Sequence, residues 1–166
     1  MPIRKPTRLQ GYDYSQSGIY FITICTKSKQ NLLGEIVTNT ITLSPTGEIV
    51  KTAIEKISQI HSSVIVDNYV VMPNHVHMLL ALTTTESAMP RYAPPPSTPT
   101  VSHVVRGFKE YVSKAVGVPI WQKSFHDHVV RDEPTYLKIW QYIEENPLRW
   151  EIDCHYIKEN NLCKAT

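Results

Sequence analysis

Two histidines, His75 and His77, are the residues of this chain whose type and spacing most directly suggest chemistry. They lie in an apolar, β-branched run over residues 70–80, and because side chains alternate along a strand, both imidazoles point to one face. Val76 and Met78 point to the other face and can cover a hydrophobic core. Two imidazoles side by side on a rigid strand form half of a site for a divalent metal ion. The pair alone leaves open which metal chemistry it serves.

The same spacing recurs at His126 and His128, in the sequence FHDH. We take His75 and His77 as the metal pair because their strand is longer and its opposite face is fully apolar. His126 and His128 are interpreted as polar positions near the site or as ordinary strand residues. Two further histidines, His61 and His103, have no partner at ligand spacing in the sequence.

Periodicity and helix-start residues predict the elements that position these histidines. Strands are predicted at residues 19–26, 64–72, around the histidine pair and at 125–131, with residues 34–43 as the hairpin partner of the first strand. Helices are predicted at residues 45–60, 101–115 and 133–146. Ser44 and Asp132 have the chemistry of N-caps, and Gly117 is expected to end the second helix.

The order of these elements predicts an α+β fold. Removing one hairpin strand leaves βαββαβ, the ferredoxin-like split βαβ arrangement. We therefore expect a central antiparallel sheet with helices on one face, the histidine strand at its centre and the last helix as an addition.

Length and composition indicate one domain, residues 1–166, with a proline-rich loop insertion at residues 83–100. The hydrophobic fraction of 42% and the charged fraction of 19% are those of an ordinary globular protein. No apolar run approaches the roughly 20 residues of a membrane span, so no membrane partner is expected. Cys25, Cys154 and Cys163 lack CxxC spacing and predict reduced thiols in the cytoplasm. The net charge of +2 permits a nucleic-acid partner without arguing for one.

The last helix has two distinct faces when its residues are placed at 100° intervals, as about 3.6 residues per turn require. Tyr136, Ile139 and Ile143 fall on one apolar stripe, so Tyr136 is predicted to belong to the core. Tyr142 and Asn146 are four residues apart and share the neighbouring flank. Spacing alone gives Tyr142 the role of an ordinary flank tyrosine.

Three blocks of the sequence, in this order, resemble single-tyrosine DNA transposases. The run MPNHVH at residues 72–77 resembles their HUH signature of two histidines around a hydrophobic residue. Residues 11–26 are similar to the N-terminal block of the REP-associated tyrosine transposases. Residues 121–131, followed by Tyr142-Ile143 and Asn146-Pro147, are similar to their C-terminal block. The resemblance covers roughly residues 8–150.

The resemblance implies a transposase that binds single-stranded or hairpin DNA. Such an enzyme cleaves DNA through a 5′-phosphotyrosine intermediate with a divalent metal, Mg²⁺ or Mn²⁺, and then rejoins strands. By residue, it implies that His75 and His77 bind the metal, that Tyr142 is the nucleophile and that Asn146 is the third ligand. Insertion-sequence members often have glutamine at that last position, and asparagine fits the REP-associated branch better. A glutamate, Glu144 or Glu145, stays open as an alternative ligand.

Basic residues of the second helix and of the segment before the third are candidate DNA contacts. They are Arg106, Lys109, Lys114, Lys123 and Arg131. A homodimer is expected rather than a monomer, because the proline-rich loop and the C-terminal tail offer segments that two copies can exchange. Two other functions stay open: a domesticated hairpin-DNA-binding module that does not cleave, and a metal-dependent phosphoesterase that uses water as its nucleophile.

Overall fold

The structure is a computed structural model that describes residues 12–13, 16–83 and 99–152. Most of the predicted proline-rich insertion and the C-terminal tail beyond residue 152 therefore lie outside the described residues. None of the helices in the described ranges has the length and apolar character needed to cross a bilayer.

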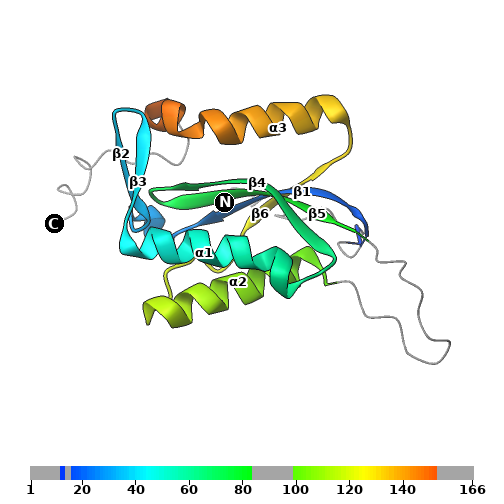
Figure 1. The fold of residues 1–166 in the computed structure, drawn as a ribbon, viewed down its shortest axis with the longest axis horizontal. Coiled ribbons are helices and arrows are strands. Elements are labelled where there is room, and N and C mark those ends of the chain that lie inside the picture. The colour runs from blue at the N-terminus through cyan, green and yellow to red at the C-terminus, as the bar shows by residue number, and fades with distance from the viewer. Residues whose placement is uncertain (1–11, 14–15, 84–98, 153–166) are drawn as a thin grey trace, which may run out of the picture.

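A four-stranded antiparallel sheet forms the centre of the molecule, in the order β4-β5-β1-β6 (Figure 1). The strands are β1 (Gly18–Cys25), β4 (Val64–Met72), β5 (His75–Leu82) and β6 (His126–Val130). The histidine strand, β5, is central, and β6 lies at one edge of the described sheet. This is the predicted ferredoxin-like order, so the expected fold class is confirmed.

Helices cover both faces of the sheet (Figure 1). Helices α1 (Pro45–Ile60) and α2 (Val101–Val116) lie on one face. Helix α3 (Glu133–Glu145) crosses the opposite face and continues into the 3₁₀ helix η2 (Asn146–Ile152). The helices of the split βαβ arrangement, α1 and α2, share one face as expected, and the added helix α3 covers the other. Its apolar stripe has a target of its own, because Ile143 packs against Leu79 and Val130 on that face.

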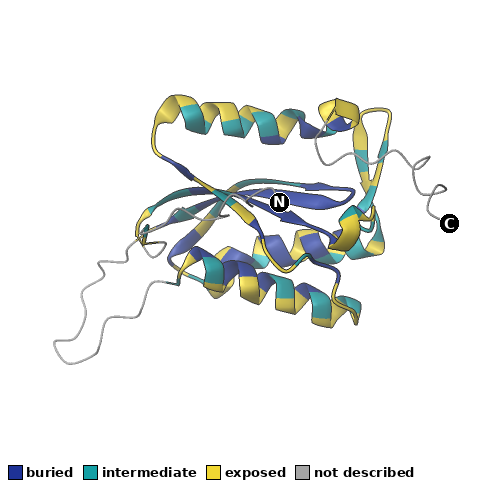
Figure 2. Ribbon diagram, turned by 180° about the vertical axis from the view of Figure 1, so that it is seen from behind, coloured by how far each residue is buried: buried dark blue, intermediate teal, exposed yellow. Residues whose placement is uncertain are grey.

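The alternation of β5 divides the core into two clusters. Val76, Met78 and Leu80 are fully buried in the main cluster, with residues of α1 and α2. His75 and His77 point to the α3 face, where Leu79 joins the smaller cluster. Figure 2 shows the buried residues concentrated in the sheet and on the inner sides of the helices.

The segment predicted as the hairpin partner of β1 instead forms a small sheet of its own. Strand β2 (Gly34–Val37) pairs with β3 (Thr40–Leu43), and neither pairs with β1. The reason is a two-residue turn at Thr38 and Asn39, whose φ angles of 50° and 61° suit a tight hairpin. A short 3₁₀ turn, η1 (Lys27–Lys29), connects β1 to this hairpin.

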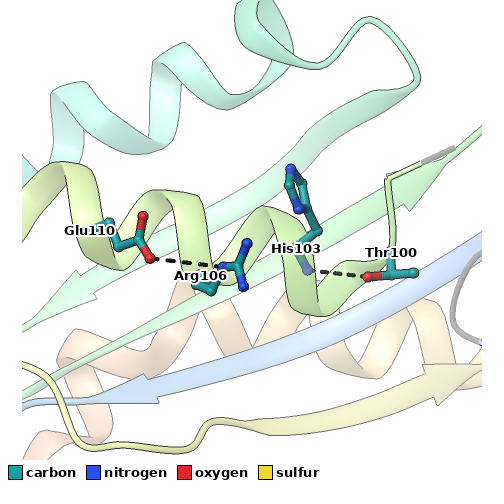
Figure 3. Close-up of polar contacts among 4 residues, drawn as sticks. All are labelled: Thr100, His103, Arg106 and Glu110. Carbon is teal, nitrogen blue, oxygen red and sulfur yellow. Dashed lines mark hydrogen bonds and ion pairs between the residues drawn. The ribbon is translucent and has the colours of Figure 1, made fainter. Parts of the chain in front are cut away.

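Helix ends follow the predicted chemistry. The Ser44 hydroxyl accepts a hydrogen bond from the Gly47 N–H at 3.0 Å, and Asp132 accepts one from the Thr135 N–H at 2.8 Å. Gly117 ends α2 in the left-handed conformation, with φ of 86°. At the other end of α2, the Thr100 hydroxyl caps the helix by accepting from the His103 N–H at 3.2 Å (Figure 3).

Candidate active site

The two histidines of β5 are buried side by side on the α3 face of the sheet. His75 is 0% and His77 is 2% exposed, and their Nε2 atoms lie 3.0 Å apart. Strand pairing fixes this geometry, because β5 is held on both sides, with Thr23 of β1 and Val70 of β4 directly opposite His77. The two ring nitrogens therefore converge, which is the arrangement that a half-site for a metal requires.

Hydrogen bonds to the outer ring nitrogens orient both imidazoles. Nδ1 of His75 lies 2.9 Å from the amide oxygen of Asn74, whose Nδ2 donates to the Lys29 carbonyl at 3.2 Å. An amide oxygen only accepts, so Nδ1 of His75 carries the proton and its Nε2 presents a lone pair. Nδ1 of His77 lies 2.9 Å from the Thr23 hydroxyl, which can donate or accept.

The separation and chemistry of the two Nε2 atoms fit a divalent cation. Metal–nitrogen bonds of about 2.1 Å that meet at a right angle leave their nitrogens about 3.0 Å apart. Metal-binding histidines usually donate their other ring N–H to an oxygen, and both His75 and His77 have such an oxygen partner.

Residues on one side of α3 and of η2 face the histidine pair. The Tyr142 hydroxyl lies 3.4 Å from Nε2 of His77, and Trp150 stacks on His75 with ring centroids 6.0 Å apart. Asn146 falls midway between these two residues in the sequence and is 1% exposed. Because residues four apart share a helix face, Asn146 lies on the side that meets the histidines.

The two tyrosines of α3 have different surroundings. Tyr136 packs against the smaller cluster, as its place on the apolar stripe predicted, and its hydroxyl donates to Asp67 at 2.6 Å. That hydrogen bond to a carboxylate raises the pKa of Tyr136 to about 12. Tyr142 instead lies against the ring of His77, with centroids 5.2 Å apart. Helix spacing alone gave Tyr142 no catalytic role, yet Tyr142 is the tyrosine of α3 that reaches the histidines.

Comparison with known proteins identifies the family. The model of the family described as "Transposase IS200 like" matches residues 15–146. The chain belongs to the IS200-like transposase family. It is also 33% identical over 171 residues to an uncharacterized protein of Haemophilus influenzae, covering 93% of each chain. The family resemblance predicted from the MPNHVH run is confirmed.

A solved structure supports the fold of this IS200-like transposase. A REP-associated tyrosine transposase bound to a REP hairpin superimposes with a TM-score of 0.62 at 22% sequence identity. The match covers 86% of this chain and 73% of that one. At this level of identity the likeness concerns the arrangement of strands and helices.

The two glutamates next to Tyr142 are engaged elsewhere in this IS200-like transposase. Glu144 accepts a hydrogen bond from Asn68 at 3.1 Å, and Glu145 pairs with Arg149 and accepts from Gln141. Within the described ranges, no three His, Cys, Asp or Glu side chains converge as a metal group. Among the candidate third ligands, Asn146 therefore has the better position.

Three of the five candidate DNA contacts line one pocket on the α2 side of the sheet. Arg106, Lys109 and Lys123 surround a space of about 520 Å³. Lys109 donates to the carbonyls of Gln122 at 2.8 Å and Ser124 at 2.9 Å, and burial lowers its pKa. Arg106 is exposed, and its Nε lies 3.8 Å from Oε1 of Glu110 (Figure 3).

The remaining two candidates, Lys114 and Arg131, do not line this pocket. Both are exposed, Lys114 in the last turn of α2 and Arg131 between β6 and α3.

Sequence reasoning missed four residues that shape the site. Thr23 and Asn74 orient the histidines, Phe21 stacks on His77 with centroids 5.1 Å apart, and Trp150 stacks on His75. Trp150 could have been found from the sequence, because it continues the four-residue spacing from Tyr142 through Asn146 and so is expected on the same face. No local pattern in the sequence points to Thr23 and Phe21, since their place beside β5 depends on the register of β1 against β5.

Proposed function

We propose that this protein is a metal-dependent single-strand DNA endonuclease and strand transferase that acts as a transposase. The observation that carries the proposal is the 3.4 Å approach of the Tyr142 hydroxyl to Nε2 of His77, at a buried histidine pair in an IS200-like transposase. Tyr142 serves as the nucleophile.

The metal ligands in this proposal are His75, His77 and Asn146. Two imidazoles and one amide oxygen leave coordination positions for phosphate oxygens and water, which suits Mg²⁺ or Mn²⁺. Held by these residues, a divalent ion would supply charge neutralisation at the phosphate and help to orient it for in-line attack.

The side chains of this chain perform the covalent steps. Tyr142 loses its phenolic proton to solvent, and its oxygen attacks the phosphorus of the scissile phosphodiester. A bond forms between this oxygen and phosphorus while the bond from phosphorus to O3′ breaks, and O3′ takes up a proton. The products are a 5′-phosphotyrosine and a free 3′-OH. A second 3′-OH can attack the phosphotyrosine, which restores a phosphodiester and frees Tyr142.

The DNA partner in this proposal is single-stranded or hairpin DNA. The structurally similar transposase was solved with a REP hairpin. In this chain, the contacts to DNA phosphates are assigned to Arg106, Lys109, Lys114, Lys123 and Arg131. Lys109 contributes mainly by holding the carbonyls at residues 122–124 in place, since its ammonium is already bound there.

A covalent-adduct assay tests the proposal. Hairpin oligonucleotides with single-stranded flanks of randomised sequence, labelled at the 3′ end, are incubated with the protein and Mn²⁺. Attack by Tyr142 attaches the 3′-labelled fragment to the protein, so a labelled band appears on a denaturing gel. Tyr142→Phe should abolish that band.

Tyr136→Phe is the matched control, because Tyr136 lies on the same helix but bonds to Asp67. Cleavage without an adduct would favour a phosphoesterase that uses water. Hairpin binding without cleavage would favour a binding module. Loss of the adduct in Tyr136→Phe alone would contradict the assignment of Tyr142.

A further inference from the structure

The edge strand β6 places its two histidines on the same face of the sheet as the proposed metal site. His126 lies directly opposite Thr23 in the strand pairing, and Thr23 lies directly opposite His77. Cross-strand partners point to the same face, so His77, Thr23 and His126 form one row across the sheet. His128 forms the next row, opposite Phe21, which stacks on His77.

These two histidines are exposed, unlike the pair on β5. His126 and His128 are exposed while Asp127, between them, points to the opposite face. Helix α3 packs mainly on β4 and β5, so it leaves this part of β6 open. The carboxylate of Asp132, which interacts electrostatically with His128, accepts a hydrogen bond from the backbone N–H of Thr135.

Strand β6 also separates the proposed metal site from the basic pocket. That pocket lies on the α2 side and is lined by Arg106, Lys123 and Phe125. His126 follows Phe125 directly in the chain. A DNA strand that is held at the pocket therefore reaches Tyr142 by passing over the edge that β6 forms.

We propose that His126 and His128 bind phosphates of the single strand that flanks the scissile phosphate. Two strand spacings place His126 about 10 Å from His77, one or two nucleotides away from Tyr142 along an extended strand. His126 and His128 are themselves about 6.6 Å apart, which is comparable with the spacing of adjacent phosphates in an extended strand. Each ring donates an N–H to a phosphate oxygen, with added attraction when the ring is protonated.

This inference rests on the proposed function, because it deepens the description of the same DNA site. It concerns contacts outside the covalent chemistry. Failure of this inference and failure of the proposed function would therefore give different results in the adduct and binding measurements below.

The experiment compares single and double alanine variants of His126 and His128 with wild type in the adduct assay. On the hairpin oligonucleotide with intact flanks, His126→Ala/His128→Ala should form the adduct about tenfold more slowly. On oligonucleotides shortened stepwise at each flank, one truncation should remove the difference between variant and wild type. His61→Ala, at the end of α1 on the other side of the sheet, should behave as wild type on every substrate.

A binding measurement gives an independent readout. On a hairpin with thymidine flanks, the double variant should bind about tenfold more weakly than wild type, because two hydrogen bonds to phosphate oxygens are lost. An unchanged affinity, or an equal loss of adduct rate on full and truncated substrates, would overturn the assignment. Absence of any adduct in wild type would contradict the proposed function, and the binding affinity would still decide whether β6 binds the strand.

Discussion

Two strands of this sheet carry histidines with the same spacing, and the sheet gives them opposite properties. His75 and His77 lie in the central strand β5, where they are buried and their Nε2 atoms are 3.0 Å apart. His126 and His128 lie in the edge strand β6 and are exposed. Position in the sheet, rather than the HxH pattern, distinguishes the pair that we propose as metal ligands from the exposed pair.

The physical difference is the number of neighbours that can orient each ring. On β5, Thr23 from the adjacent strand and Asn74 from the preceding turn each bond one outer ring nitrogen. On β6, one side of the strand faces away from the described sheet, so water competes for the ring nitrogens of His126 and His128. Preorganised nitrogens favour a metal, whereas hydrated ones suit a ligand such as phosphate that brings its own oxygens.

The largest contrast is expected in metal binding. His77→Ala removes one of two converging nitrogens and should lower Mn²⁺ affinity by more than about 100-fold, since changes at outer partners alone cost about 10–100-fold. His126→Ala should leave Mn²⁺ affinity as in wild type. Isothermal titration calorimetry with Mn²⁺ measures both. Equal losses in the two variants would break the distinction between the strands.

A second contrast concerns stability, because β5 crosses the main core. Leu80 is 0% exposed, and Leu80→Ala should lower the free energy of unfolding by about 2–5 kcal/mol through lost burial and the resulting cavity. The edge-strand substitution Val129→Ala deletes less volume and should cost less. Urea denaturation followed by circular dichroism measures both, and a larger loss in Val129→Ala would contradict the expected hierarchy.

A smaller effect is expected for the residue that orients His77. Thr23→Val keeps the shape of the side chain but removes the hydroxyl next to Nδ1 of His77. Mn²⁺ affinity should fall about 10-fold, at the low end of outer-partner effects, with the fold intact. Calorimetry measures the affinity, and circular dichroism serves as the control for folding. Unchanged affinity would show that strand packing alone orients the ring.

The smallest effect is expected at the junction that connects β6 to α3. The pKa of Asp132 is lowered below its ordinary value, chiefly by hydrogen bonding from Thr135. Its contribution to stability is therefore present above the unfolded pKa and is lost as pH falls through the lower folded value. Urea denaturation below about pH 4 should show a steeper loss in wild type than in Asp132→Asn. Parallel pH profiles would contradict this assignment.

Local sequence signals predicted much of the fold. The alternation around His75 and His77, the caps at Ser44 and Asp132, and the two faces of α3 are properties of a few adjacent residues, and the structure has them all. The hairpin at residues 34–43 was assigned to the wrong partner because its turn residues, Thr38 and Asn39, are not the Asn-Gly pair that usually marks such a turn.

Contacts between distant segments could not be read from the sequence. Thr23 is 54 residues from His77, and only the register of β1 against β5 brings them together. The register of β1 against β6 places His126 in the same row. The sequence also could not predict which face of the sheet α3 covers, because the apolar stripe of this helix could pack on either side. Tyr142 was therefore assigned through family resemblance, and the structure supplies its approach to His77.

The proposed site draws its two halves from different hydrophobic clusters. The histidines belong to a strand that is anchored in the main core, whereas Tyr142 and Asn146 are carried by a helix that docks through Ile143, Leu79 and Val130. Local opening free energies follow the burial of each unit, so α3 should exchange its amide hydrogens faster than β5. We therefore expect α3, and Tyr142 with it, to undock while the rest of the fold persists.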